Sequence, residues 1–241
     1  TQITWMDVKI DNHAITPRNG KTVELNALWY NALKIMARLA EKYENKQLCR
    51  KYLEMAEKTK KSFDEKFYNE EKHCLYDVLG DSKVRPNQLF ALSLSHPIVD
   101  NAEIAEQVLS TVENKLLNKY GLKTLSSDED GYVDVYEGSA YKRDSSYHQG
   151  ITWPWLLGLY YDALKSTMII EKNRTKRQEL EEKITKLVYT TKETFKAEMF
   201  ERSSIGTISE IYDSTEPYEE RGAFAQAWSV AEIFRIVLNK R

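Results

Sequence analysis

The chain has few of the residues that interrupt regular structure: of 241 residues, 9 are glycine and 5 are proline. A fold of many short strands joined by tight turns needs more of both, so the composition disfavours β-rich architectures. Only two cysteines are present, Cys49 and Cys74. They cannot form a disulfide framework and have no paired spacing typical of zinc sites. We therefore predict a cytoplasmic protein in a reducing environment.

The sequence also lacks a dominant charge and a long apolar run. Lys and Arg number 35 and Asp and Glu 37, for a formal net charge of −2, so no basic field favours nucleic acid. No segment approaches the roughly 20 apolar residues of a membrane span. Hydrophobic residues make up 41% of the chain, enough for a core. We expect one soluble domain over residues 1–241 with neither nucleic acid nor membrane as a partner.

Apolar residues recur at the three-and-four spacing of helices in seven segments. A chain about two-thirds helical is predicted, with one short strand near 75–79 and a long loop over 120–149 that holds a strand or two. Loops of that length inside compact domains are often functional. The predicted helices cover 22–43, 48–67, 85–95, 104–116, 150–170, 180–195 and 222–238.

Two kinds of helix alternate along the chain. Helices near 22, 85, 150 and 222 are apolar, whereas those near 46, 101 and 174 carry charges on one face. The alternation indicates an all-α fold of helix hairpins in two layers, an α/α toroid with an apolar inner layer. The side chains predicted to lie in its core are Trp29, Leu33, Leu156, Trp228 and Phe234.

The segments before the inner helices are rich in aromatic, amide, guanidinium and carboxylate side chains. Flat aromatic faces stack on sugar rings and the polar groups bind vicinal hydroxyls, so the mixture favours a carbohydrate ligand. The alternative is that tryptophans fill the core and polar residues occupy loops, as in any helical protein. Trp153 and Trp155 flank a proline and cannot both face one side, so at least one is expected to pack in the core. The candidate contacts are Trp5, Glu24, Arg85, Asn87, His148, Gln149, Trp153, Trp155 and Arg221.

Glycoside hydrolysis requires two carboxyl groups, one to protonate the leaving oxygen and one to activate water or attack carbon. Asp7 follows Trp5 and Met6, whose apolar groups are expected to desolvate it, as an acid catalyst requires. Glu210 lies in a loop where hydroxyls and Arg221 are expected to keep it ionised. For any one acid among 37, a solvated surface charge is the simpler interpretation.

Other kinds of site are not indicated. The four histidines are scattered, so no metal site is predicted. A lone histidine such as His148 is more often a structural residue than a ligand-binding one. No glycine-rich phosphate loop, nucleophile elbow or dinucleotide fingerprint is present. We therefore expect no metal and no organic cofactor.

Several motifs together resemble the C-terminal amylo-α-1,6-glucosidase domain of glycogen debranching enzymes, in that family's order across the whole chain. They include Thr4-Trp5-Met6-Asp7, Thr16-Pro17-Arg18, Val23-Glu24-Leu25-Asn26, Arg85-Pro86-Asn87-Gln88, Tyr147-His148-Gln149-Gly150, Trp153-Pro154-Trp155, Gly206-Thr207-Ile208-Ser209-Glu210 and Ala225-Gln226-Ala227-Trp228. The resemblance implies an (α/α)6 barrel that removes the branch-point glucose of glycogen or limit dextrin with inversion. It assigns Asp7 as general acid and Glu210 as general base, in agreement with the assignment from the residues.

The sequence departs from that family in helix number, because the family barrel has twelve helices and about seven are countable here. Such an incomplete barrel would expose an apolar seam. We expect a second copy of the chain or an additional N-terminal segment to cover it, and weak or absent activity of this chain alone. Two alternatives stay open: another α/α-barrel α-glucosidase or trehalase-like hydrolase, and a non-catalytic glycan-binding or scaffold fragment.

Overall fold

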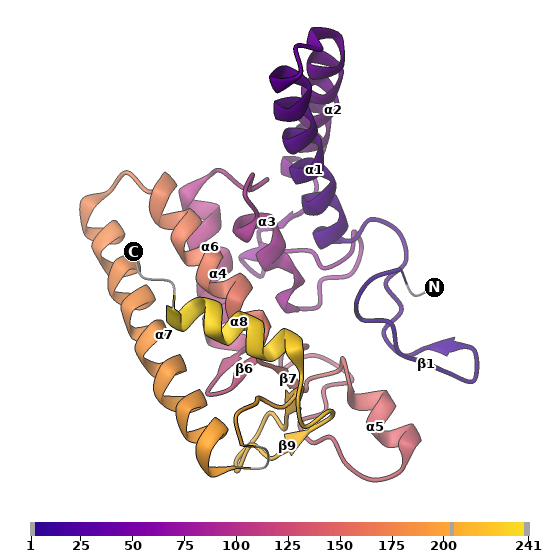
Figure 1. The fold of residues 1–241 in the computed structure, drawn as a ribbon. Helices are drawn as coiled ribbons and strands as arrows, with labels where there is room; N and C mark the ends of the chain where they lie inside the picture. The colour runs from indigo at the N-terminus through magenta and orange to yellow at the C-terminus, as the bar shows by residue number, and fades with distance from the viewer. Residues whose placement is uncertain (1–2, 203–204, 239–241) are drawn as a thin grey trace.

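A computed structural model describes residues 3–202 and 205–238, of which about 53% are helical. Eight α-helices and one short 3-10 helix occur in these ranges, one α-helix more than the seven helices predicted and with a lower helical content (Figure 1). The helices are α1 (Val23–Lys42), α2 (Lys46–Asp64), η1 (Pro86–Leu89), α3 (Phe90–Ser93), α4 (Ala102–Lys115), α5 (Ala140–Ser146), α6 (Leu156–Ile170), α7 (Arg174–Glu201) and α8 (Ala227–Leu238).

Asparagine caps explain where the three charged helices begin. The side chain of Asn45 accepts a hydrogen bond from the backbone N–H of Leu48 at the start of α2. Asn101 caps α4 and Asn173 caps α7 in the same way, each accepting from two backbone N–H groups. Such caps satisfy donors that the first helical turn leaves unpaired. None of the described helices is both long and apolar enough to cross a membrane.

A small antiparallel sheet of five strands was not predicted as a unit. Its order is β5-β6-β7-β8-β9, so it joins the loop after α4, the start of α6 and the segment before α8. Two further hairpins, β1 (Lys9–Ile10) with β2 (His13–Ala14) and β3 (Tyr68–Asn69) with β4 (Cys74–Leu75), lie outside it. The sheet strands are β5 (Leu117–Asn118), β6 (Gly121–Lys123), β7 (Thr152–Trp153), β8 (Ile211–Tyr212) and β9 (Glu220–Arg221).

Helix α6 lies at the centre of the body and packs against α3, α4, α7 and α8. Its sequence is apolar almost all round, as a helix contacted on several sides requires. Leu156 is fully buried, which confirms its predicted place in the core. Leu33 of α1 is buried as well.

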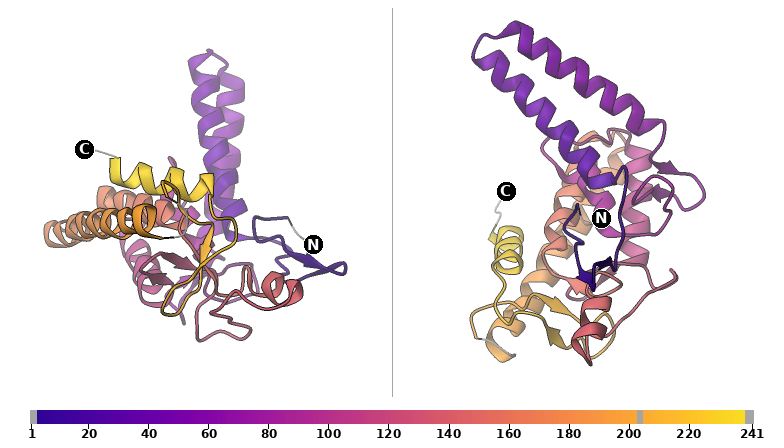
Figure 2. Two further views of the ribbon diagram at one scale, coloured as in Figure 1. Left: turned by 60° about the horizontal axis from the view of Figure 1, so that its bottom comes forward. Right: turned by 90° about the vertical axis from the view of Figure 1, so that its right-hand side faces the viewer.

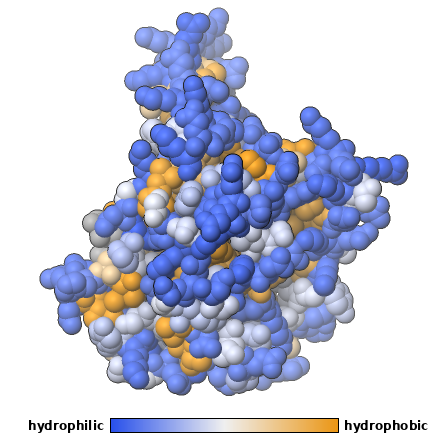
Figure 3. Space-filling view, turned by 180° about the vertical axis from the view of Figure 1, so that it is seen from behind, coloured by the Kyte–Doolittle hydropathy of each residue, from blue (hydrophilic) through white to orange (hydrophobic). Residues whose placement is uncertain are grey.

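The hairpin of α1 and α2 projects away from this body (Figures 1 and 2). Beyond its partner α2, α1 contacts the body mainly through α3 and η1. One face of α1 is therefore exposed, and Trp29 keeps 51% of its surface accessible. Seen from behind, a mostly hydrophilic surface is broken by several hydrophobic patches, including where the hairpin joins the body (Figure 3).

Several predictions need correction. Trp29, Trp228 and Phe234 are exposed to between 40% and 51% and are not core residues, because the described elements cover these side chains only in part. Helix α8 begins at Ala227 and not at 222, and α5 lies within the predicted loop. The fold is mostly helical but not all-α, and a closed toroid is not seen.

Candidate active site

The five-stranded sheet determines where Glu210 lies. Glu210 immediately precedes β8, and its backbone N–H donates to the carbonyl of Ala223 just after β9. Between them Gly222 adopts a φ of 70°, and a Cβ at that position would overlap the Glu210 carboxylate. Glycine is required there because it tolerates positive φ and leaves space for the close approach.

Three donors hold the Glu210 carboxylate. Tyr147 Oη donates to Oε1 at 2.6 Å, and Gln226 Nε2 donates to the same oxygen at 3.2 Å. The backbone N–H of Ala223 donates to Oε2 at 2.9 Å. An ionised carboxylate has about four lone-pair sites, so Oε2 retains the capacity to accept a proton or a hydrogen bond from water.

A cleft of about 600 Å³ opens beside Glu210. Arg221 lies in it but pairs with Asp213 at 2.8 Å and with no Glu210 oxygen, so the expectation that Arg221 keeps Glu210 ionised is corrected. Arg143 was not among the candidate residues, because it lies in α5, within a segment whose sequence carries no periodic pattern and was predicted to be a loop. The residues that line the cleft are Tyr136, Glu137, Gly138, Arg143, Glu210, Arg221 and Gly222.

Asp7 lies near the same tyrosine that holds Glu210. Burial, the hydrogen bond to Glu210 and the charges of Glu210, Tyr136 and Asp7 together raise the pKa of Tyr147. Glu210 thus contacts this phenol directly, whereas Asp7 acts on it through its charge alone. Asp7 itself is exposed, so the expected desolvation by Trp5 and Met6 is wrong in this structure, although Met6 is buried.

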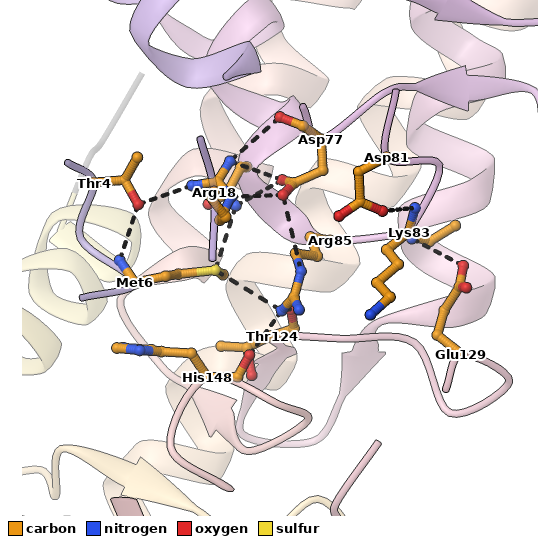
Figure 4. Close-up of polar contacts among 12 residues, drawn as sticks. Thr4, Met6, Arg18, Asp77, Asp81, Lys83, Arg85, Thr124, Glu129 and His148 are labelled. Atoms are coloured by element: carbon orange, nitrogen blue, oxygen red, sulfur yellow. Dashed lines mark hydrogen bonds and ion pairs between the residues drawn. The ribbon is translucent and has the colours of Figure 1, made fainter. Parts of the chain in front are cut away.

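A buried ionic cluster lies behind the segment that carries Asp7 (Figure 4). Arg18 is 2% exposed and binds both Glu24 and Asp77 through two contacts each. Burial lowers the pKa of Arg18, but the hydrogen bonds and charges of the two carboxylates outweigh this effect and raise it above its ordinary value. Asp77 and Arg18 are absent from the candidate set, although Arg18 ends the Thr16-Pro17-Arg18 motif.

Arg85 and Asn87 extend this cluster. Arg85 donates to the carbonyls of Thr124 and His148 at 2.9 and 2.7 Å and to Gln149 Oε1 at 2.8 Å (Figure 4). Asn87 donates to Asp77 Oδ1 at 2.8 Å and accepts from the Trp5 indole at 2.7 Å. Both side chains are buried and engaged with protein groups. They hold neighbouring segments together in this structure.

Four of the five tryptophans form an aromatic cluster around His148. Trp5 makes edge contacts to the rings of His148, Trp153 and Trp155 with centroids 5.0 to 5.4 Å apart. Trp155 stacks on Trp228 at 3.9 Å, which leaves one side of Trp228 exposed. Trp153 and Trp155 are both buried, in agreement with the expectation that at least one packs in the core.

His148 is neutral within this cluster. Burial, together with the positive charges of Arg85 and Arg18, lowers the pKa of His148 to about 3. Its Nδ1 is buried without a hydrogen-bond partner among the described residues. The ring stacks on Trp153 at 5.5 Å. His148 therefore acts here as an apolar ring that shapes the aromatic cluster.

The structure brings the predicted residues into one region but at different depths. Trp5, Gln149 and Arg221 are half-buried. Within residues 3–202 and 205–238, no group of three or more His, Cys, Asp or Glu side chains is placed to hold a metal ion. The fully buried candidates are Glu24, Arg85, Asn87, His148, Trp153 and Trp155.

The fold and this site define a mostly helical protein in which the Glu210 carboxylate is held by three hydrogen bonds in an open cleft. A family model for amylo-α-1,6-glucosidase matches residues 1–235, and the chain belongs to this family. A solved structure named sialidase is similar at a TM-score of 0.68, with 13% identity over 95% of this chain and 20% of that chain. At this identity the likeness concerns the fold alone. The chain spans about a fifth of the length of that solved chain.

Proposed function

We propose that this chain carries the catalytic carboxylates of an inverting glycoside hydrolase, an amylo-α-1,6-glucosidase that acts on the branch-point glucose of glycogen or limit dextrin. The substrate is a branched α-glucan, and the reaction takes place in the cytoplasm. In this proposal the helices form an arc of an (α/α)6 toroid, with Asp7 and Glu210 on its inner side. Membership of the amylo-α-1,6-glucosidase family supports the substrate class.

The observation that carries the proposal is the set of three hydrogen bonds that holds the Glu210 carboxylate in a cleft of about 600 Å³. Tyr147 Oη donates to Glu210, and the charge of Asp7 acts on the same phenol. In an inverting enzyme the two carboxyl groups stand about 6.5 to 9.5 Å apart, which leaves room for the sugar and a water between them.

The roles follow from the surroundings of each acid. Glu210 accepts three hydrogen bonds, which fix its carboxylate in one position, as a base requires. Its Oε2 would take a proton from the attacking water. Asp7, on the solvent side, would give its proton to the leaving glycosidic oxygen. An incoming glucan would supply the desolvation of Asp7 that the free protein lacks.

A second candidate is glycan binding without turnover. The exposure of Asp7 favours it, because an exposed carboxyl group is hydrogen-bonded to water and is not enclosed against a substrate oxygen. An aromatic cluster beside a polar cleft would suffice for binding. A trehalase-like hydrolase of the same barrel class remains the enzymatic alternative.

Glucose release from branched limit dextrin, with maltose and trehalose in parallel, tests the three functions. We expect Asp7→Asn and Glu210→Gln each to lower turnover by about 10² to 10⁴ while glucan binding persists. Release of β-glucose, followed by NMR, would confirm inversion.

The exposed residues Asp11 and Glu219 provide matched controls. Asp11→Asn and Glu219→Gln should leave turnover within about twofold of the parent chain, because neither side chain enters the proposed chemistry. Binding without glucose release by the parent chain would favour the second candidate. Preference for trehalose would favour the trehalase-like hydrolase.

A further inference from the structure

Arg18 uses all its hydrogen-bond donors inside the protein. A guanidinium has five N–H groups in a fixed fork. Nε donates to Asp77 at 2.6 Å, and the two terminal nitrogens each bind Glu24. The remaining two donors reach Asp77 Oδ1 at 2.9 Å and Thr4 Oγ1 at 3.0 Å. No donor is left for a ligand, so Arg18 cannot act by binding substrate in this conformation.

The contact to Thr4 reaches the segment that ends in Asp7. Thr4 Oγ1 also accepts the backbone N–H of Met6 at 3.3 Å, which closes a tight turn just before Asp7. Met6 is 1% exposed, and its sulfur lies against the side-chain nitrogens of Arg85 and Asn87 (Figure 4). The backbone on the N-terminal side of Asp7 is therefore fixed by a polar and an apolar contact.

A second connection leads from the next residue to the same cluster. The Trp5 indole donates to Asn87 Oδ1 at 2.7 Å, and Asn87 donates to Asp77 Oδ1 at 2.8 Å. Asp77 is one of the two carboxylates that hold Arg18. Residues 4 and 5 thus reach one buried cluster by two routes, whereas the Asp7 side chain extends into solvent.

From these contacts we propose that Arg18 is a positioning residue for Asp7, acting through Thr4 and the Thr4–Met6 turn. The proposal rests on the proposed function, in which Asp7 is the acid. Its physical reason is that an exposed carboxylate with no hydrogen-bond or ion-pair partner among residues 3–202 and 205–238 takes its position from the backbone that carries it. Small displacements of a catalytic group cost turnover more than binding. Through its hydrogen bond to Thr4, Arg18 ties that backbone to a buried ion cluster and so fixes its position.

The test removes the Thr4 hydroxyl and leaves the buried ions intact. Thr4→Val keeps the side-chain shape but cannot accept from Arg18 or Met6, whereas Thr4→Ser keeps the acceptor. Thr111→Val is the matched control, because the Thr111 hydroxyl donates to a backbone carbonyl of the β3–β4 turn, away from Asp7. Thr4 is half-buried, so each variant is expected to fold.

Two measurements on the full chain decide the proposal. In hydrogen–deuterium exchange, we expect the segment 4–8 to exchange about tenfold faster in Thr4→Val and at the parent rate in Thr4→Ser and Thr111→Val. In glucose release from limit dextrin, Thr4→Val should lower kcat about tenfold with KM within about threefold, and Thr4→Ser should restore kcat.

The outcomes distinguish the positioning role of Arg18 from the proposed glucosidase function. Unchanged exchange in Thr4→Val overturns the positioning role whatever the activity. Faster exchange with parental kcat also overturns it, because the turn would then be structural only. If the parent chain and a form extended at its N-terminus both release no glucose, the proposed function fails, and so does a role for Arg18 in catalysis. Faster exchange in that case would still place Arg18 as the anchor of segment 4–8.

Discussion

Helices α6 and α1 have similar lengths and abundant apolar residues, yet their environments differ. From Leu156 to Leu164 almost every side chain of α6 is buried, because four other helices pack around it. In α1 the buried residues form one narrow stripe, and Leu28 and Trp29 are 38% and 51% exposed. The difference shows that an apolar helical face becomes core only where another element is placed to cover it.

The two regions meet at Arg18, which joins Glu24 in the first turn of α1 to Asp77 in the body. Arg18→Ala is expected to lower the stability of the protein more than any other substitution considered. Removal of the guanidinium leaves two buried carboxylates without their counter-ion, and we expect a loss of about 3 to 5 kcal/mol in the free energy of unfolding.

Urea denaturation followed by circular dichroism measures this loss. Lys115→Ala provides the control, because Lys115 pairs with Asp128 at the surface, where both side chains are about half exposed. Such a pair contributes about 0 to 1 kcal/mol. Equal effects of the two substitutions would contradict a stabilising role for the buried cluster.

Two leucine-to-alanine substitutions, one in α6 and one in α1, compare the stability that each helix gains from its apolar side chains. Leu156→Ala in α6 should destabilise by about 2 to 5 kcal/mol, because it opens a cavity in a fully buried site. Leu28→Ala in α1 should cost about 1 kcal/mol or less, since the side chain is already partly in water. Thermal unfolding of both variants measures the difference.

If Leu28→Ala cost as much as Leu156→Ala, the outer face of α1 would have to be covered in solution. Sedimentation velocity on the parent chain would then show whether a second copy covers it. A monomer with the same large loss would mean that the position of the hairpin differs from the one described.

Taken per pH unit, the smallest of these effects on stability is expected from His148. His148 has a pKa of about 3 when folded and about 6.5 when unfolded. Between these values the unfolded chain binds the extra proton, so stability contributed by neutral His148 is present above pH 6.5 and is lost as pH falls toward 3. The loss should be about 1.4 kcal/mol per pH unit.

Unfolding free energies at pH 6.5, 5.5 and 4.5 test this slope. His148→Gln should remove the contribution from the slope, and His13→Gln, at an exposed position, should not change it. A parental slope in His148→Gln would show that His148 is accessible to protons in the folded state.

Much of the helical framework could be predicted from the sequence. The periodic spacing of Leu25, Leu28, Ala32 and Met36 predicts a helix that the structure places at Val23–Lys42, and the family membership predicted from the motifs is confirmed. The same spacing could not show which face is covered. That is why Leu33 was correctly placed in the core and Trp29 was not.

The candidate site was predicted in part. The motifs lead to Glu210 and to Tyr147 beside it, since each lies in a short segment of unusual composition. Neither Asp77 nor the pairing of Arg221 with Asp213 could be predicted, because the partners are set by the fold. The five-stranded sheet was missed for a related reason. Its strands are two or three residues long, and a period cannot be detected over so few.

The helices and their caps follow from local sequence. Helix formation depends on the spacing of apolar residues and on side chains within reach of the first turn, such as Asn45, Asn101 and Asn173. By contrast, the burial of Arg18, the exposure of Asp7 and the hydrogen bonding of Glu210 depend on the tertiary structure. Those properties depend on contacts between residues far apart in the chain, such as Arg18 with Asp77 and Tyr147 with Glu210. The physical reason is that charge, solvation and hydrogen bonding at a site are set by whichever segments the fold brings next to it.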